Sequence, residues 1–541
     1  MTKFFNFFKS KPRPFVWAIL SGVLVGTSYI PFPGWALFFC YCPLWLAASD
    51  FQDDLTEINY KRIFALGWLT QFILTLIGFN WIYYVASEFG LLHWSLSAGA
   101  LLLFAALMHV YIPFSLVISA FLISRFQLQK RWVQFVLFAL TLSLLERIWP
   151  SIFEWNLAYS LLWMKWPLYQ WADTVGFWGL STWILLGQAC VSYGFLFWKT
   201  NKRKMFTIFA SLFFTFLALS GFGILKQKKW SHFDQKIQFG LVQGNVGNAD
   251  KVQSEQKQNY QSYILNVYSE LTEKHLKENP QTEIMLWPET AMPFALDATF
   301  LDRQDQRQLL GLIGGWKIPL ITGGYSVDLD KKDHLGNFLV SNAVFFMGAN
   351  GAALAETYDK TDLLVFGEYM PFGRQLPILY KLLPFVGNYK IGPGPSLREI
   401  SVHDKILRLG PQICYESLNP SFSRGLASKG AQIIFNVTND SWFGWWAEPF
   451  QHQLMTLGRA IEVRRPLVRS TNTGISSVIL ANGDRLENSP LNQTWAHTYE
   501  INYLENPPQS FYTQLGHFDW LLWILIFAGL IHFYRKQGKH V

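Results

Sequence analysis

The stretch MFTIFASLFFTFLALSGFGI, residues 205–224, decides how this chain is organised. It holds 20 residues in a row without a charged side chain, the length that a helix needs to cross about 30 Å of hydrocarbon. Charge and polarity rise directly after it, and residues 225–517 alternate between the hydrophobic periodicity of strands and that of helices. The sequence therefore predicts a membrane domain at residues 1–224 and a separately folded polar domain at residues 225–517.

Seven further apolar segments extend the membrane part. They lie at residues 15–30, 34–49, 63–86, 91–123, 132–149, 171–198 and 518–534. Only 15% of the chain is charged and 17% is aromatic, whereas about 25% of an average soluble protein is charged. We therefore predict a polytopic α-helical membrane domain of eight spans. Seven precede the polar domain, and the eighth opens the last segment, residues 518–541.

Basic residues are concentrated in alternate loops between these spans. The loops after the second, fourth, sixth and eighth spans hold Lys61, Arg62, Arg125, Lys130, Arg131, Lys199, Lys202, Arg203, Lys204, Arg535, Lys536 and Lys539. The loops around residues 31–33, 87–90 and 150–170 hold only Lys165 among lysines and arginines. By the positive-inside rule, both termini are then cytoplasmic and the polar domain lies outside. This placement accounts for much of the net charge of +8, so we expect no nucleic acid as a partner.

We predict that the polar domain is an α/β or α+β sandwich with its own core, because short apolar strands alternate with amphipathic helices. Strands are predicted at residues 237–242, 283–287, 319–327, 338–347, 353–358, 406–413 and 431–436. Helices are predicted at residues 255–276, 301–313 and 451–463. Residues 474–480 and the segment after the turn at Asn482-Gly483 are predicted to form a hairpin.

One cysteine stands apart from the other three. Cys40, Cys42 and Cys190 fall in apolar spans, so Cys414 is the only thiol between residues 225 and 517. Such a residue is either a small buried apolar side chain or a reactive thiol. Cys414 ends an apolar strand and precedes Tyr-Glu-Ser, a polar exit of the kind on which catalytic groups are often mounted. The second interpretation therefore makes Cys414 a candidate nucleophile.

A thiol needs a base and an electrostatic partner to act as a nucleophile near neutral pH. Glu289, in WPET at residues 287–290, ends a strand, where burial would raise the pKa of its carboxyl group. Lys360 follows an extended segment, and Glu368 lies in a turn bounded by Gly and Pro. Taken singly, a strand-end glutamate is more often a loop cap and such a lysine is more often solvated. Together Glu289, Lys360 and Cys414 supply a base, a cation and a thiol at the ends of successive strands.

The segments WPET, YDKTDLLVFGEYMPF and ICYES carry these three residues in an order that resembles the Glu-Lys-Cys triad of the carbon–nitrogen hydrolase (nitrilase) superfamily. With the eight predicted spans, the chain resembles the apolipoprotein N-acyltransferase family. The segments NDSWFG at 439–444, RRPLVRSTNTG at 464–474 and EWNLAYS at 154–160 match that family too. The resemblance implies a nitrilase-like αββα sandwich in the periplasm and a multi-pass location in a bacterial inner membrane.

The resemblance also implies an activity: acyl transfer from the sn-1 position of a phospholipid to the N-terminal α-amine of S-diacylglyceryl-cysteine in apolipoproteins. Cys414 would carry the acyl group as a thioester, Glu289 would move the proton, and Lys360 would stabilise the oxyanion. The reaction is then ping-pong and needs no metal and no cofactor. The implied partners are a phospholipid donor, a diacylated apolipoprotein acceptor and the membrane, and we expect a monomer.

Further site residues follow from the same resemblance. Glu368 is expected to orient Lys360, and Tyr415 and Glu416 are expected to shape the entrance. Trp155 and Trp442 are expected to contact lipid.

Two positions depart from the family pattern. Glu154 stands where the family usually has Pro, and Val252 follows Lys251 where a Trp is common. Two other functions compete with acyl transfer. A membrane-tethered amidohydrolase would use the same triad with water as the acceptor. A transporter or receptor would need ionisable groups within the spans, and here Glu146 and Arg147 lie only at the edge of one.

Overall fold

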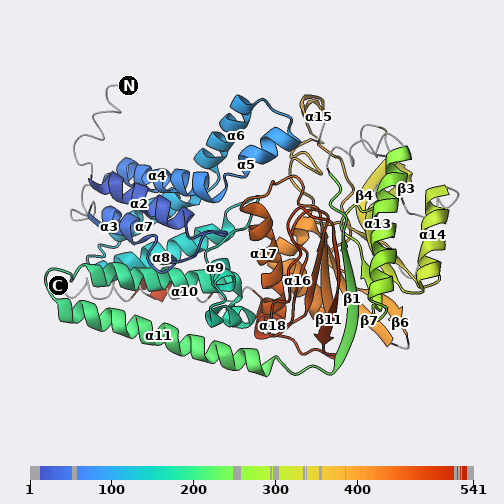
Figure 1. Ribbon diagram of the computed structural model, residues 1–541. Helices are drawn as coiled ribbons and strands as arrows, with labels where there is room; N and C mark the ends of the chain where they lie inside the picture. Colours follow the sequence, from blue (N-terminus) through green and yellow to red (C-terminus); the bar gives the residue numbers. More distant parts are fainter. Residues whose placement is uncertain are drawn as a thin grey trace. The chain divides into compact units, whose positions relative to one another are not determined.

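The computed structural model describes residues 13–50, 58–247, 258–292, 295, 304–332, 336, 338–352, 356–373, 375–383, 386–403, 405–516, 521, 524–525, 527–529 and 531–532. The chain divides into two compact units (Figure 1). One comprises Met1–Lys226 with His517–Val541, and the other comprises Gln227–Gly516.

Within its described residues, the regular structure of the first unit is helical. Its elements are α2 (Arg13–Gly26), α3 (Cys42–Asp50), α4 (Tyr60–Gly78), α5 (Ile82–Tyr84), η1 (Val85–Phe89), α6 (Trp94–Leu107), α7 (Tyr111–Arg125), α8 (Arg131–Ile148), α9 (Tyr159–Trp163), η2 (Pro167–Trp171), α10 (Ala172–Phe195) and α11 (Lys202–Lys229). Helix α4 packs against both α2 and α7, while α8 packs against α7 and α10. These pairings build a bundle from helices that are apolar on most of their faces.

Several of these helices have the length and composition of membrane spans. Three helical stretches qualify within the described residues: Trp94–Arg125, Pro167–Phe195 and Lys202–Lys229. The pair Tyr60–Gly78 and Ile82–Glu88 qualifies as a fourth if its two helices, bent by 69°, form one span. The prediction of a multi-pass helical region is confirmed in this form, with three or four candidate spans.

The predicted second span differs from the observed helix. Residues 34–49 were predicted as one span, but residues 35–41 form turns and the helix starts only at Cys42. Pro43 fits this start, because proline is tolerated in the first turn of a helix and not in its interior. Most of the predicted eighth span, 518–534, lies outside the described residues.

The second unit is built on two β-sheets. The six-stranded sheet has the order β11 (Trp495–Tyr503), β1 (Gln235–Gln243), β2 (Ile284–Leu286), β3 (Leu320–Lys332), β4 (Phe338–Met347) and β5 (Tyr358–Asp359). The five-stranded sheet has the order β10 (Ser477–Ile479), β9 (Leu467–Thr471), β8 (Ile433–Thr438), β7 (Lys405–Ile413) and β6 (Arg398–Val402). The two sheets face each other, since the ring of Phe346 on β4 lies 6.1 Å from that of Phe435 on β8.

Helices cover the outer face of each sheet, as Figure 1 shows. Helices α13 (Gln258–Glu278) and α14 (Gln304–Trp316) pack on the six-stranded sheet around Trp287, which is fully buried. Helices α16 (Pro420–Ser428) and α17 (Glu448–Val463) pack on the five-stranded sheet. Shorter helices are α15 (Ile378–Leu382), η4 (Cys414–Leu418) and α18 (Phe511–Leu515). This arrangement is the predicted αββα sandwich.

Parallel strands place the ends that carry polar residues at one edge of each sheet. Strands β1, β2 and β3 run parallel to one another, as do β7, β8 and β9. The residues that follow β2 and β7 include Glu289 and Cys414. Loops at the carboxyl ends of parallel strands are common sites for ligands and catalysis.

Candidate active site

Three predicted residues form one buried charged cluster. Lys360 Nζ lies 2.8 Å from Glu368 Oε1 and 3.5 Å from Glu289 Oε1. The lysine side chain is 1% exposed, so solvent screens these ion pairs little. Glu289 follows β2 and Lys360 follows β5, so the sheet brings together residues that lie far apart in the sequence. Glu368 contacts Lys360 in the way expected of a residue that orients it.

Asn342 on β4 joins the two carboxylates and was not predicted from the sequence. Its Nδ2 donates to Glu289 Oε1 at 2.7 Å and to Glu368 Oε1 at 3.0 Å. The backbone N–H of Leu364 donates to the other oxygen of Glu368 at 2.8 Å. Glu368 therefore accepts from a lysine, an amide and a backbone group, which fixes its position. The only sequence signal for Asn342 is a polar side chain inside the apolar run of residues 338–347.

Cys414 is buried at the start of η4 and has a backbone conformation that is uncommon for a residue with a side chain. Its φ angle is 51°, in the left-handed region. Burial raises the pKa of the Cys414 thiol, and the charge of Glu289 raises it further, while Lys360 lowers it. The thiol thus lies within electrostatic reach of both residues. It rests in its neutral form and needs a base in order to attack.

Lys360 remains charged in this setting. Burial by itself would lower the pKa of Lys360, but Glu368, Glu289 and Cys414 together raise it above its ordinary value. The site therefore presents a fixed ammonium group beside a neutral thiol. A fixed cation of this kind stabilises negative charge that develops during a reaction.

Glu416 is fully buried, which corrects the expectation that it shapes an entrance. Its carboxylate accepts from the backbone N–H of Ile413 at 2.7 Å and from that of Thr361 at 2.6 Å. It therefore joins the residue before Cys414 to the residue after Lys360. Burial raises the pKa of Glu416 to about 7, while these N–H groups lower it.

Tyr415 is half-buried and contacts a second cluster of buried polar residues, which includes Glu448 and His452. Its hydroxyl donates to Glu448 Oε1 at 3.1 Å, and its ring stacks on that of His452 with 4.8 Å between centroids. Trp442 is half-buried in the segment after β8.

Trp155 lies in the helical unit. It is 3% exposed and packs against Tyr29 and Tyr159, with ring centroids 5.1 and 5.6 Å away. Glu154 precedes it, whereas Lys251 and Val252 lie outside the described residues. Lipid contact by Trp155 and Trp442 stays a prediction.

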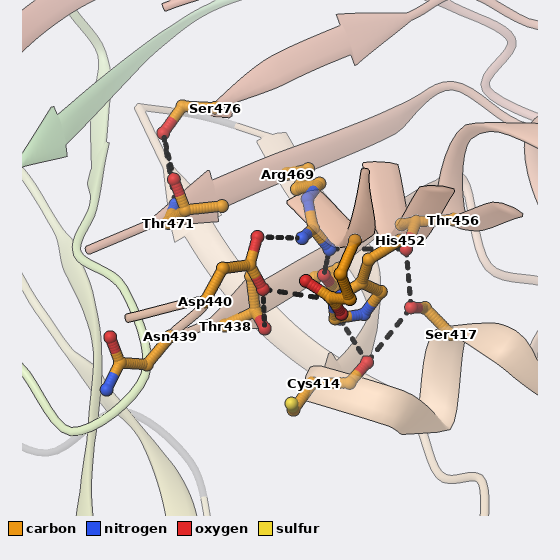
Figure 2. A network of polar contacts seen from close by, with 12 residues as sticks. Cys414, Ser417, Thr438, Asn439, Asp440, His452, Thr456, Arg469, Thr471 and Ser476 are labelled. Atoms are coloured by element: carbon orange, nitrogen blue, oxygen red, sulfur yellow. Dashed lines mark hydrogen bonds and ion pairs between the residues drawn. The ribbon is translucent and has the colours of Figure 1, made fainter. Parts of the chain in front are cut away.

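A buried ion-pair network lies beside Cys414 and was also not predicted (Figure 2). Asp440 Oδ2 accepts from Arg469 Nη2 at 2.7 Å, and Asp440 Oδ1 lies 3.0 Å from His452 Nδ1. Burial would raise the pKa of Asp440, but Arg469 and His452 lower it to about 2. Asp440, Glu448 and His452 are close enough for one atom of each to lie within 4.8 Å of the others. The guanidinium of Arg469 already neutralises this group, which favours an ion-pair network over a cation site.

Comparisons with known proteins cover both units. The model of the carbon-nitrogen hydrolase family matches residues 240–502, and that of the apolipoprotein N-acyltransferase N-terminal domain matches residues 21–190. An apolipoprotein N-acyltransferase of Bdellovibrio bacteriovorus is 48% identical over 531 residues, which cover 98% of this chain and 96% of that protein. One of Geobacter metallireducens is 27% identical over 540 residues, with 98% and 97% covered. The likeness extends over both units and nearly the full length of each relative, so this chain belongs to the apolipoprotein N-acyltransferase family.

Proposed function

We propose that this protein transfers the sn-1 acyl chain of a phospholipid to the N-terminal α-amine of S-diacylglyceryl-cysteine in apolipoproteins, which completes lipoprotein maturation. Family membership supports the N-acylation of apolipoproteins. The candidate spans support a lipid donor, because an enzyme within the bilayer need not move an acyl chain into water at about 0.8 kcal/mol per CH₂. The observation that carries the proposal is Lys360, held 3.5 Å from Glu289 and 2.8 Å from Glu368, with its charge acting on the buried thiol of Cys414.

The first half-reaction loads Cys414. Glu289 takes the thiol proton as the sulfur attacks the carbonyl carbon of the sn-1 ester. The ammonium of Lys360 stabilises the tetrahedral oxyanion, and one such donor contributes about 2.7–4 kcal/mol in a typical enzyme. The carbon–oxygen ester bond then breaks, and Glu289 returns its proton to the lysophospholipid alkoxide. The acyl group remains on the sulfur as a thioester.

The second half-reaction unloads Cys414. The α-amine of the apolipoprotein attacks the thioester carbonyl, and Glu289 accepts the proton that the nitrogen loses. The carbon–sulfur bond breaks, the thiolate takes the proton back, and an amide has formed. Glu368 and Asn342 hold Lys360 and Glu289 in place during both steps. Catalysis is ping-pong, because the acyl group rests on Cys414 as a thioester between the two half-reactions.

For the topology, we infer eight spans with both termini in the cytoplasm and residues 225–517 in the periplasm of a bacterial inner membrane. The basic residues in alternate loops support this orientation. Protease added to intact spheroplasts should cut within residues 225–517 and spare an epitope tag on either terminus. A protected domain, or a tag that is cleaved, would contradict the inferred orientation.

The activity is tested with purified protein in lipid nanodiscs, a phospholipid labelled in its sn-1 chain and a diacylated lipoprotein. We expect the wild type to form an N-acylated product and, without acceptor, a labelled thioester at Cys414. Cys414→Ser should form neither product. Cys190→Ser, which changes a thiol on α10 of the helical unit, is the matched control and should behave as wild type.

Three outcomes would redirect the proposal. N-acylation by Cys414→Ser would refute the assigned nucleophile. Product labelled only when the label is placed in the sn-2 chain would refute the donor position. Release of free fatty acid without N-acylation would favour the alternative, a membrane-tethered hydrolase that uses water as the acceptor.

A further inference from the structure

We propose that Arg469 and Asn436 are positioning residues that hold the backbone of Cys414 in the conformation from which its thiol attacks. The inference rests on the proposed role of Cys414 as the nucleophile. With φ at 51°, Cys414 occupies the left-handed region, which disfavours residues that have a Cβ atom. Such a conformation persists only where the surroundings hold it in place. The contacts of its own carbonyl group show what does so.

The carbonyl oxygen of Cys414 accepts two side-chain hydrogen bonds. Asn436 Nδ2 on β8 donates to it at 3.1 Å, and Ser417 Oγ within η4 donates to it at 2.9 Å. Both donors are fully buried. Together they fix the peptide group that follows Cys414, and therefore the direction in which the residue leaves β7.

Arg469 determines which way the amide of Asn436 points. Arg469 Nη1 donates to Asn436 Oδ1 at 2.7 Å. Because a guanidinium group only donates, it requires the amide oxygen on its side and turns the amide nitrogen toward the carbonyl of Cys414. If the amide were rotated, its nitrogen would face the guanidinium donor of Arg469 and its oxygen would face the carbonyl oxygen of Cys414. Neither contact could then form a hydrogen bond, in a place that is fully buried.

Asp440 and His452 hold Arg469 in turn. The second guanidinium nitrogen, Nη2, donates to Asp440 Oδ2 at 2.7 Å, and His452 Nδ1 lies 3.0 Å from Asp440 Oδ1 (Figure 2). A buried ion pair of this kind contributes little net stability, because removing both charges from water costs about as much as the attraction returns. Its hydrogen bonds instead fix the orientation of the Arg469 side chain. They form a continuous chain of contacts from His452 through Asp440, Arg469 and Asn436 to the carbonyl group of Cys414.

Two substitutions test the role of orientation. Asn436→Asp keeps the shape and can still pair with Arg469, but an ionised carboxylate has no N–H for the carbonyl of Cys414. Arg469→Lys keeps the charge but lacks the fork that contacts Asn436 and Asp440 together. The matched control is Arg465→Lys, since Arg465 is equally buried and donates to backbone carbonyls that include those of Ala431 and Pro508.

The readouts are single-turnover thioester formation, KM for the phospholipid, and alkylation of Cys414 by iodoacetamide, read by mass spectrometry. Thermal unfolding corrects all rates for the folded fraction. We expect Asn436→Asp and Arg469→Lys to slow thioester formation by about 10- to 100-fold, since small misplacements have such effects, with KM changed less than about twofold. Alkylation should also slow, because a displaced thiol loses the influence of Lys360. Arg465→Lys should keep its rates per folded molecule within about twofold.

The proposal is overturned if both variants react within about threefold of wild type per folded molecule, or if Arg465→Lys loses as much. If Asn436→Asp does not fold, Ser417→Ala removes the other donor to the same carbonyl and should slow thioester formation by about 3- to 10-fold; an unchanged rate contradicts the proposal. Failure of the proposed function has a different signature. Wild type would then carry no acyl group on Cys414, while alkylation of Cys414 would still report whether Arg469 and Asn436 position its thiol.

Discussion

Replacing Glu368 by glutamine separates its charge from its shape. In the native site, its carboxylate accepts from Lys360 Nζ at 2.8 Å, from Asn342 Nδ2 at 3.0 Å and from the N–H of Leu364 at 2.8 Å. A glutamine side chain offers one acceptor oxygen and one amide nitrogen. In either rotamer, its NH₂ group faces a donor that the carboxylate oxygen had satisfied.

The expected loss follows from burial. Lys360 is 1% exposed, and removing one partner from a buried ion pair costs about 3–5 kcal/mol. Glu289 remains near Lys360 and recovers part of this cost, but pairing with the ammonium stabilises its ionised form and weakens it as the proposed proton acceptor. A residual loss of about 3 kcal/mol in the transition state corresponds to a rate of thioester formation that is roughly 100-fold lower.

Single-turnover thioester formation in nanodiscs measures this rate, with KM for the phospholipid and the thermal midpoint determined in parallel. Glu399→Gln, which neutralises an exposed glutamate on β6, is the matched control and should react as wild type does. If Glu368→Gln loaded its thiol within about threefold of wild type, the carboxylate would not organise Lys360. A loss confined to KM would place Glu368 in substrate binding and also contradict this reasoning.

Three further changes have directions set by single contacts. Burial raises the pKa of Glu416 to about 7, above roughly 4.3 in an unfolded chain, so the folded state binds this proton more tightly. The free energy of unfolding should therefore fall by roughly 3 kcal/mol as pH rises from about 4 to 7. Denaturant titrations of Glu416→Gln should show a stability that depends less on pH. In Gly474→Ala, the new Cβ would lie 2.1 Å from Asp440 Oδ2, so thioester formation should slow by about tenfold in the same assay. In Gly323→Ala, the Cβ would lie 2.7 Å from the backbone of the turn that carries Glu289, the proposed base; thermal denaturation should show a loss of about 1–3 kcal/mol, whereas Gly311→Ala, with open space around its Cβ, should show none.

The sequence singled out Glu289 and Cys414 because each follows an apolar run that ends in polar residues, and Lys360 because it follows an extended segment. Such runs mark buried strands, and the carboxyl ends of parallel strands carry functional groups in many folds. The structure places Glu289 and Lys360 in contact and Cys414 under the influence of both. Strand bounds were also close where the pattern was strong, since the predicted strand at residues 338–347 is β4.

The partners of the triad could not be predicted, because they depend on which strands become neighbours. Asn342 reaches the two carboxylates only because β4 lies between β3 and β5. Arg469 reaches Asn436 only because β9 pairs with β8 in the register that sets these two residues opposite each other. Strand β9 was not among the predicted strands, and its segment LVRST carries an arginine, a residue type that is rarely fully buried.

The pairing of β1 with β11 affects how the polar domain folds during its synthesis. These strands are antiparallel along their full length, from Gln235 opposite Tyr503 to Gln243 opposite Trp495, so the first strand of the domain to be synthesised pairs with the last. At about 5–20 residues per second, the ribosome needs on the order of tens of seconds to deliver the partner. During that time one edge of β1 presents unpaired N–H and C=O groups, which other extended chains can join. A nascent chain stalled before residue 495 would keep that edge of β1 open to pairing with other extended chains.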